Sequence, residues 1–133
     1  MFNRQFVLLI LAIGVALGVG CIKVGYIFYA KIDPTSEAGL TKLRSLIYSF
    51  SPVVEKLHQL ENSQKELPDH LENLNGLPEH FLTTFPLLHL SNHGESFTLY
   101  YKLDWDSSLR YDSLNRSWSF DPGDGNPEIR IRL

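Results

Sequence analysis

Apolar residues form one continuous run near the start of the chain and become periodic further on. No charged residue occurs from Phe6 to Ile22, and after Lys23 the apolar character resumes and continues to Ala30. A helix needs about 20 apolar residues to cross the hydrocarbon core of a bilayer, and the long side chain of Lys23 can extend to an interface. Residues 1–30 are therefore predicted to form an N-terminal transmembrane helix, a single-pass signal-anchor.

Two other interpretations of this stretch stay open. Ala16-Leu17-Gly18 has the small-x-small form of a secretory cleavage site behind a short basic N-terminus. Gly20-Cys21 matches the end of a bacterial lipobox, although Gly18 stands where a large aliphatic residue belongs. Either alternative would change how the protein is held at the membrane.

Small residues recur at helical spacing inside the predicted span. They lie on two lines of the helix surface: Ala12, Ala16 and Gly20 on one, Gly14 and Gly18 on the other. Such lines let two helix backbones approach closely in lipid, where packing drives association. They predict contact with a protein partner or a homodimer through the membrane helix, although small residues are also common in membrane helices generally.

Residues 31–66 have the periodicity of an amphipathic helix. Pro34 disfavours continuation of the preceding helix, and Ser36 is a suitable N-cap. Apolar residues then recur at alternating spacings of three and four: Leu40, Leu43, Ile47, Phe50, Val54 and Leu57. This stripe either packs on a sheet of the same domain or forms a coiled coil with a partner helix. Pro52 is expected to kink or restart the helix, and residues 61–66 are expected to be a polar linker.

Shorter elements follow from residue 67 onward. Leu67-Pro68 and Leu77-Pro78 predict two short helices, because proline is favoured at the first helical position. The apolar period then becomes two, which predicts strands at Leu87–Leu90, Ser96–Leu103, Leu109–Asp112, Ser117–Phe120 and Glu128–Leu133. In the last strand Ile129, Ile131 and Leu133 are expected to point inward.

The predicted fold class is therefore α+β. Short loops indicate an antiparallel meander of four or five strands, with helices covering its apolar face. Residues 31–133 are expected to form one soluble domain, composed of the amphipathic segment 31–66 and of the segment 67–133 with its short helices and sheet.

Charge is distributed unevenly along the chain. The whole sequence has a net charge of −3, but ten basic and fifteen acidic residues follow Ala30, which gives −5 over residues 31–133. Nucleic-acid binding depends on basic residues that neutralise phosphates, so no nucleic-acid partner is expected. The one cysteine, Cys21, cannot form an intramolecular disulfide.

Candidate chemistry in the sequence is weak. Asp104 with Asp106, and Asp121 with Asp124 and Asn126, could supply oxygen ligands to calcium, but Asx turns explain the same residues without a metal. His70 and His80, each preceded by an acidic residue, are a weaker metal candidate. Aromatic residues including Trp105, Trp118, Tyr100, Tyr101 and Tyr111 fit either a core or a binding face. No catalytic, metal or cofactor site is therefore predicted.

The order of elements gives one architectural resemblance. A membrane helix, an amphipathic helix and an antiparallel meander together resemble the layout of type IV pilin-like subunits. Met1–Gln5 does not match their leader, and Phe6–Ile22 lacks their acidic residue, so no site residue is transferred. The resemblance implies an assembly subunit as an alternative function.

The sequence thus predicts a non-catalytic interaction or accessory component of a membrane-associated assembly. We expect it in a bacterial inner membrane, in contact with the lipid bilayer. Arg4 lies on one side of the apolar stretch and Lys23, Lys31, Lys42 and Arg44 on the other, so the positive-inside rule taken literally would place the C-terminal domain in the cytoplasm. A short basic region before an apolar run instead has the layout of an exported N-terminus, and on this ground we expect the domain outside the cytoplasm. A small extracytoplasmic hydrolase or a metal-dependent sensor domain is the alternative from another class.

Overall fold

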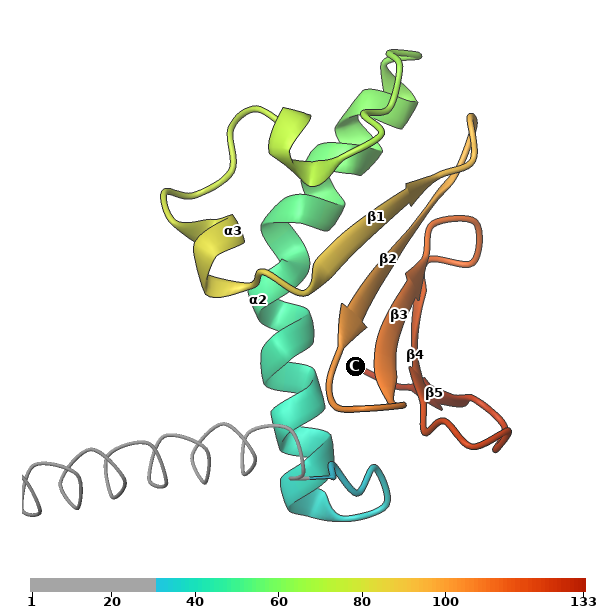
Figure 1. Cartoon of the computed structure of the whole chain (residues 1–133). Coiled ribbons are helices and arrows are strands. Elements are labelled where there is room, and N and C mark those ends of the chain that lie inside the picture. Colours follow the sequence, from blue (N-terminus) through green and yellow to red (C-terminus); the bar gives the residue numbers. More distant parts are fainter. Residues whose placement is uncertain (1–30) are drawn as a thin grey trace, which may run out of the picture. The chain divides into compact units, whose positions relative to one another are not determined.

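A long helix, α2 (Glu37–Asn62), opens the part of the chain that the computed structural model describes, residues 31–133 (Figure 1). A short 3₁₀ turn, η1 (Leu71–Asn73), and a single helical turn, α3 (Phe81–Thr84), follow it. The five strands then complete one compact unit, Ile32–Leu133. The predicted transmembrane segment, residues 1–30, lies outside the described residues. Within residues 31–133 no helix has the length and apolarity needed to cross a bilayer.

The start of α2 is held by a folded turn. Ser36 is the N-cap, as predicted, and its Oγ accepts a hydrogen bond from the amide of Gly39 at 3.0 Å. Asp33 accepts hydrogen bonds from the hydroxyl and amide of Thr35, and these lower the pKa of its carboxyl. The carbonyl of Asp33 lies so close to Gly39 that an added Cβ would be 1.8 Å from the oxygen. Glycine therefore permits this turn to fold over the helix end.

The apolar stripe of α2 faces the sheet. Leu43, Ile47, Phe50 and Leu57 are at most 2% exposed, whereas Leu40 and Val54 are only partly buried. Val53, which the spacing did not select, is fully buried instead. Since a helix advances 3.6 residues per turn, both Val53 and Val54 lie near the stripe after Phe50.

The helix also runs further than expected. It continues without a break through Pro52 to Asn62, so residues 61 and 62 belong to the helix and not to the predicted linker. Proline removes one intrahelical hydrogen bond, but its neighbours Phe50 and Val53 are fully buried. We attribute the continuity of the helix to this packing.

The sheet is an antiparallel meander in the order β1-β2-β3-β4-β5, which confirms the predicted topology. Its strands are β1 (Leu88–Asn92), β2 (Phe97–Lys102), β3 (Ser108–Asp112), β4 (Ser117–Asp121) and β5 (Ile129–Ile131). The predicted inward direction of Ile131 is confirmed, because this residue is 5% exposed. Ile129 pairs with the buried Phe120 and so lies on the predicted face, but it is 38% exposed. Leu133 follows the strand and is 69% exposed. Within residues 31–133, β5 is the last strand of the sheet.

Aromatic rings join α2 to the sheet. The Phe50 ring lies 5.0 Å from that of Tyr101 and 5.9 Å from that of Trp118, measured between centroids. Phe85, which ends α3, contacts the same Phe50 ring edge-on at 5.0 Å. The two predicted short helices exist as η1 and α3, but each begins three residues after its proline, behind His70 and His80. These elements and α2 together cover the inner face of the sheet.

Candidate functional site

The predicted partner stripe is occupied within the domain. Leu43, Ile47, Phe50 and Leu57 belong to the same core cluster as residues of all five strands. Leu40 and Val54 lie at its margin. A coiled-coil partner could reach the stripe only if it displaced the sheet.

A different surface is open beside α2. Two hollows adjoin there, of about 370 and 250 Å³, and they share Arg116, Trp118 and Leu133. The larger, which we call the arginine hollow, is lined by Arg116, Ser117, Trp118, Arg130, Ile131, Arg132 and Leu133. The smaller, the apolar hollow, is lined by Ile47, Tyr48, Ser51, Val54, Glu55, Tyr111, Arg116, Trp118 and Leu133. Together they form what we call the α2–β5 groove.

The chain closes the end of this groove with its last residues. Arg44 of α2 donates a hydrogen bond from Nε to the carbonyl of Arg132 at 3.2 Å. In Figure 1 the C-terminus accordingly lies between α2 and the sheet. The groove is therefore built from α2, the β3–β4 hairpin and β5, which are remote in sequence.

The apolar hollow exposes large side chains. Tyr48 is 65% exposed and Leu133 is 69% exposed, and both line the hollow. Its floor is better protected, since Trp118 and Tyr111 are each 5% exposed. Tyrosine, tryptophan and arginine are the side chains most enriched at the energetic centres of protein interfaces.

A partly buried chain of hydrogen bonds includes Tyr111 of the groove floor. His58 Nε2 lies 2.7 Å from the hydroxyl of Tyr111, and His58 Nδ1 lies 2.6 Å from a carboxylate oxygen of Glu61. A neutral imidazole that donates to Glu61 through Nδ1 can accept the Tyr111 hydroxyl at Nε2. Burial raises the pKa of Tyr111, so its hydroxyl remains a donor at neutral pH. This network joins α2 to β3.

Replacing Tyr111 with phenylalanine should weaken that junction. The change leaves His58 Nε2 without its partner in a site where the imidazole side chain is 14% exposed. We expect a loss of about 1–3 kcal/mol in the free energy of unfolding, measured by urea denaturation of the full chain in detergent. Tyr100→Phe is the matched control, because Tyr100 lies on the adjacent strand and is 39% exposed. Equal losses in both variants would contradict a specific role for the network.

The acidic loops are turns that carboxylates stabilise from within. Asp104 is 5% exposed and accepts hydrogen bonds from the amides of Asp106 and Ser107. Burial alone would raise the pKa of Asp104, but these hydrogen bonds lower it. Asp121 likewise accepts from the amide of Gly123 at 2.9 Å. The two loops meet, because a Cβ at Gly123 would lie 2.6 Å from Cγ of Asp106.

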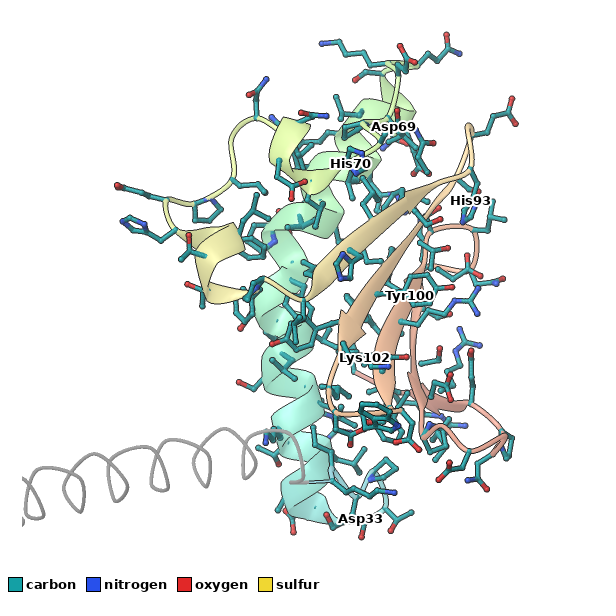
Figure 2. The ribbon with its side chains drawn as sticks, in the orientation of Figure 1. Asp33, Asp69, His70, His93, Tyr100 and Lys102 are labelled. Carbon is teal, nitrogen blue, oxygen red and sulfur yellow. The ribbon has the colours of Figure 1, made fainter. Side chains whose placement is uncertain are left out.

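The metal candidates do not converge in the part of the chain that the structure describes. No group of three or more His, Cys, Asp or Glu side chains that could hold an ion occurs among residues 31–133. Asp69 and His70 lie together near η1, whereas His93 lies at the turn between β1 and β2 (Figure 2). His80 and Glu79 pair at 3.3 Å, and both side chains are strongly exposed.

The outer face of the sheet carries a polar row, one residue from each strand. His89, Tyr100, Arg110, Ser119 and Arg130 are paired in register across β1 to β5. Arg130 belongs to this row and also lines the arginine hollow, because β5 lies at the edge of the sheet. Arg110 lies over the Tyr100 ring at 5.6 Å and pairs with Glu128 at 3.2 Å. Lys102 lies two residues after Tyr100 on β2 and therefore on the same face of the sheet (Figure 2). Of the aromatic residues weighed as a binding face, Trp105 is the most exposed at 85%, while Trp118 lies at the floor of the groove.

Sequence analysis did not identify the α2–β5 groove. Its cationic side comes from the hairpin residue Arg116 and from Arg130 and Arg132 of the last strand segment. The alternation of arginines with apolar residues after Glu128 is visible in the sequence, but it is equally typical of an edge strand. Only the fold brings Tyr48 into the same hollow as Arg116, which also lines the arginine hollow.

Comparisons of the chain with protein-family models, with curated proteins and with solved structures each gave no match. The function of the chain is therefore inferred from its own residues and geometry.

Proposed function

We propose that this chain is a single-pass membrane-anchored protein whose α+β domain is a non-catalytic interaction component of a membrane-associated assembly. The uncharged stretch Phe6–Ile22 supports the anchor, because its composition suits the hydrocarbon core of a bilayer. The short N-terminal region before it has the layout of an exported N-terminus. We place the domain outside the cytoplasm of a bacterial cell, at the inner membrane.

The α2–β5 groove is the observation that carries the interaction role. It exposes Tyr48 and Leu133 beside arginine side chains, over a rigid floor of Trp118 and Tyr111. Rigid aromatic anchors lose little conformational entropy when a partner covers them. A partner that contacts the groove would cover the most exposed apolar side chains of α2 and of the chain end.

Co-purification from native membranes tests this role. The full chain carrying Tyr48→Ala should lose a partner that the unchanged chain retains, because Tyr48 is exposed and lines the groove. Trp105→Ala is the control, since Trp105 is also strongly exposed but does not line either hollow of the groove. A partner lost equally from both variants, or retained by both, would contradict the assignment of the groove.

Membrane anchoring has its own test. After alkaline carbonate extraction of membranes, the full chain should remain in the pellet and should begin at its original N-terminus. Recovery of a soluble form cut behind Gly18 or Gly20 would replace the anchored protein with an exported, freely diffusing one.

Packing of the membrane helix gives a further prediction. Gly14→Leu with Gly18→Leu should weaken self-association in a bacterial two-hybrid assay for membrane helices, because the larger side chains keep two backbones apart. Val15→Leu with Val19→Leu changes a different line of the helix at the same spacing and should preserve the signal. An unchanged signal in the glycine variant would eliminate contact through this line.

A pilin-like assembly subunit is a second candidate. The observation that favours it is the packing of an antiparallel meander on the long helix that follows the predicted membrane segment. Electron microscopy distinguishes the two: filaments from the full chain would support the assembly subunit, and discrete complexes with another protein would support the interaction component.

A further inference from the structure

We propose that the α2–β5 groove binds an extended acidic segment of a partner protein, with carboxylates on the arginine hollow and a large apolar side chain in the apolar hollow. This inference rests on the proposed function and specifies the partner that the groove fits.

The charge of the arginine hollow is the first argument. Residues 31–133 contain five arginines, and three of them, Arg116, Arg130 and Arg132, line this one hollow. No acidic side chain lines it, and no ion pair with these three arginines occurs among residues 31–133. A net positive site thus stands out in a domain whose net charge is −5.

Arginine is also the side chain best suited to carboxylates. Its planar guanidinium donates two parallel hydrogen bonds to a carboxylate, which gives both strength and orientation. The side chains of Arg116, Arg130 and Arg132 therefore have hydrogen-bond donors that remain available for carboxylates of a partner.

The second argument is the apolar hollow beside the arginines. Trp118 and Leu133 line both hollows, so a ligand bound to the arginines continues onto an apolar surface. Tyr48 forms the far side of that surface. The matching ligand carries acidic groups and an apolar side chain close together.

The acidic groups around the groove favour a peptide over an anionic membrane surface. Glu55 lines the apolar hollow, a few residues along α2 from Tyr48. A broad anionic surface would approach this carboxylate and a domain of net charge −5, which disfavours binding. A peptide can place its carboxylates on the arginines alone. In addition, within residues 31–133 β5 is an edge strand, with no described strand on one side of its backbone, and such edges accept extended peptides.

Fluorescence anisotropy of the full chain in nanodiscs of zwitterionic lipid tests the proposal. The probe is a labelled synthetic peptide with several glutamates around a single leucine. Its controls are the same peptide with glutamine for each glutamate and the same peptide with serine for leucine. We expect saturable binding of the acidic peptide that weakens with salt, as screening of charge requires, and weaker binding of both controls.

Charge-matched protein variants locate the site. Combined replacement of Arg116, Arg130 and Arg132 by glutamine should weaken binding by at least about tenfold, since each lost charge-assisted hydrogen bond is expected to exceed a neutral one. Replacement of three exposed lysines outside the groove, Lys42→Gln, Lys65→Gln and Lys102→Gln, changes net charge equally and should alter binding by less than about twofold. Far-ultraviolet circular dichroism confirms that both variants remain folded.

The outcomes separate the inference from the proposed function. Equal binding by the two variants, or no difference among the three peptides, would overturn the acidic-segment proposal. If the arginines were needed only for binding to vesicles that contain phosphatidylglycerol, and not for binding to the peptide, the proposal would be overturned in favour of a membrane surface. If the acidic peptide does not bind but the Tyr48→Ala variant still loses its native partner, the interaction role is supported and the acidic-segment proposal is overturned.

Discussion

Replacing Ile47 with aspartate should remove a large part of the stability of the domain. Ile47 is 2% exposed and belongs to the core cluster between α2 and the sheet. A carboxylate there would lose its hydration without a partner, a change that costs about 3–5 kcal/mol. Single domains of this size are stable by only about 5–15 kcal/mol, so the variant should unfold at a much lower denaturant concentration.

Tryptophan fluorescence can measure this loss selectively. The chain has two tryptophans, and Trp118 is 5% exposed whereas Trp105 is 85% exposed. In a Trp105→Phe background the emission therefore reports on Trp118 in the core. Ser49→Asp is the control, because it places the same charge two residues away on the exposed side of α2. Similar denaturation curves for Ile47→Asp and Ser49→Asp would show that α2 does not pack on the sheet as described.

The fold was largely predictable because its local and global signals agree. Phe97, Leu99, Leu109 and Phe120 alternate with polar residues, and their strands are separated by loops too short for anything but antiparallel neighbours. The apolar stripe of α2 is buried against this same sheet. Periodicity therefore predicted both layers, but it left open whether the stripe packs on the sheet or on a partner helix, and the structure shows the sheet.

The sequence showed on which face Ile129 lies but not how exposed it is. Ile129 pairs with Phe120 in register but is 38% exposed, and within residues 31–133 β5 is the last strand of the sheet. Alternation shows on which face a side chain lies, but not whether another layer covers that face. The effect of Pro52 was likewise not predictable from its own residue type, because the helix continues through it beside the fully buried Phe50 and Val53.

The candidate site was less accessible to sequence reasoning for a geometric reason. The groove combines Tyr48 from α2, Arg116 from a hairpin and Arg130 from the last strand. None of these has a fixed spacing to the others, so no motif could connect them. His58 and Tyr111 were likewise unrelated in sequence, although they are 2.7 Å apart through their polar atoms.

Truncating Phe50 to alanine is the other change with a large expected effect. Phe50 is fully buried, and its ring contacts those of Phe85, Tyr101 and Trp118. Removal of a large buried side chain leaves a cavity that the surrounding structure fills only in part, at a cost of about 3–5 kcal/mol. The fluorescence of Trp118 should also change in the folded state, because the two rings are 5.9 Å apart.

Phe50→Leu separates lost volume from lost aromatic contacts. Leucine keeps most of the apolar volume, so this variant should lose only about 1–2 kcal/mol and should keep a cooperative transition. If the free energy of unfolding falls stepwise from Phe50 to leucine and then to alanine, the contacts of this one ring stabilise the packing of α2, the segment ending at Phe85 and the sheet. Equal losses of unfolding free energy in the alanine and leucine variants would contradict this. The ring of Phe50 would then stabilise neither the segment that ends at Phe85 nor Trp118 in the floor of the groove.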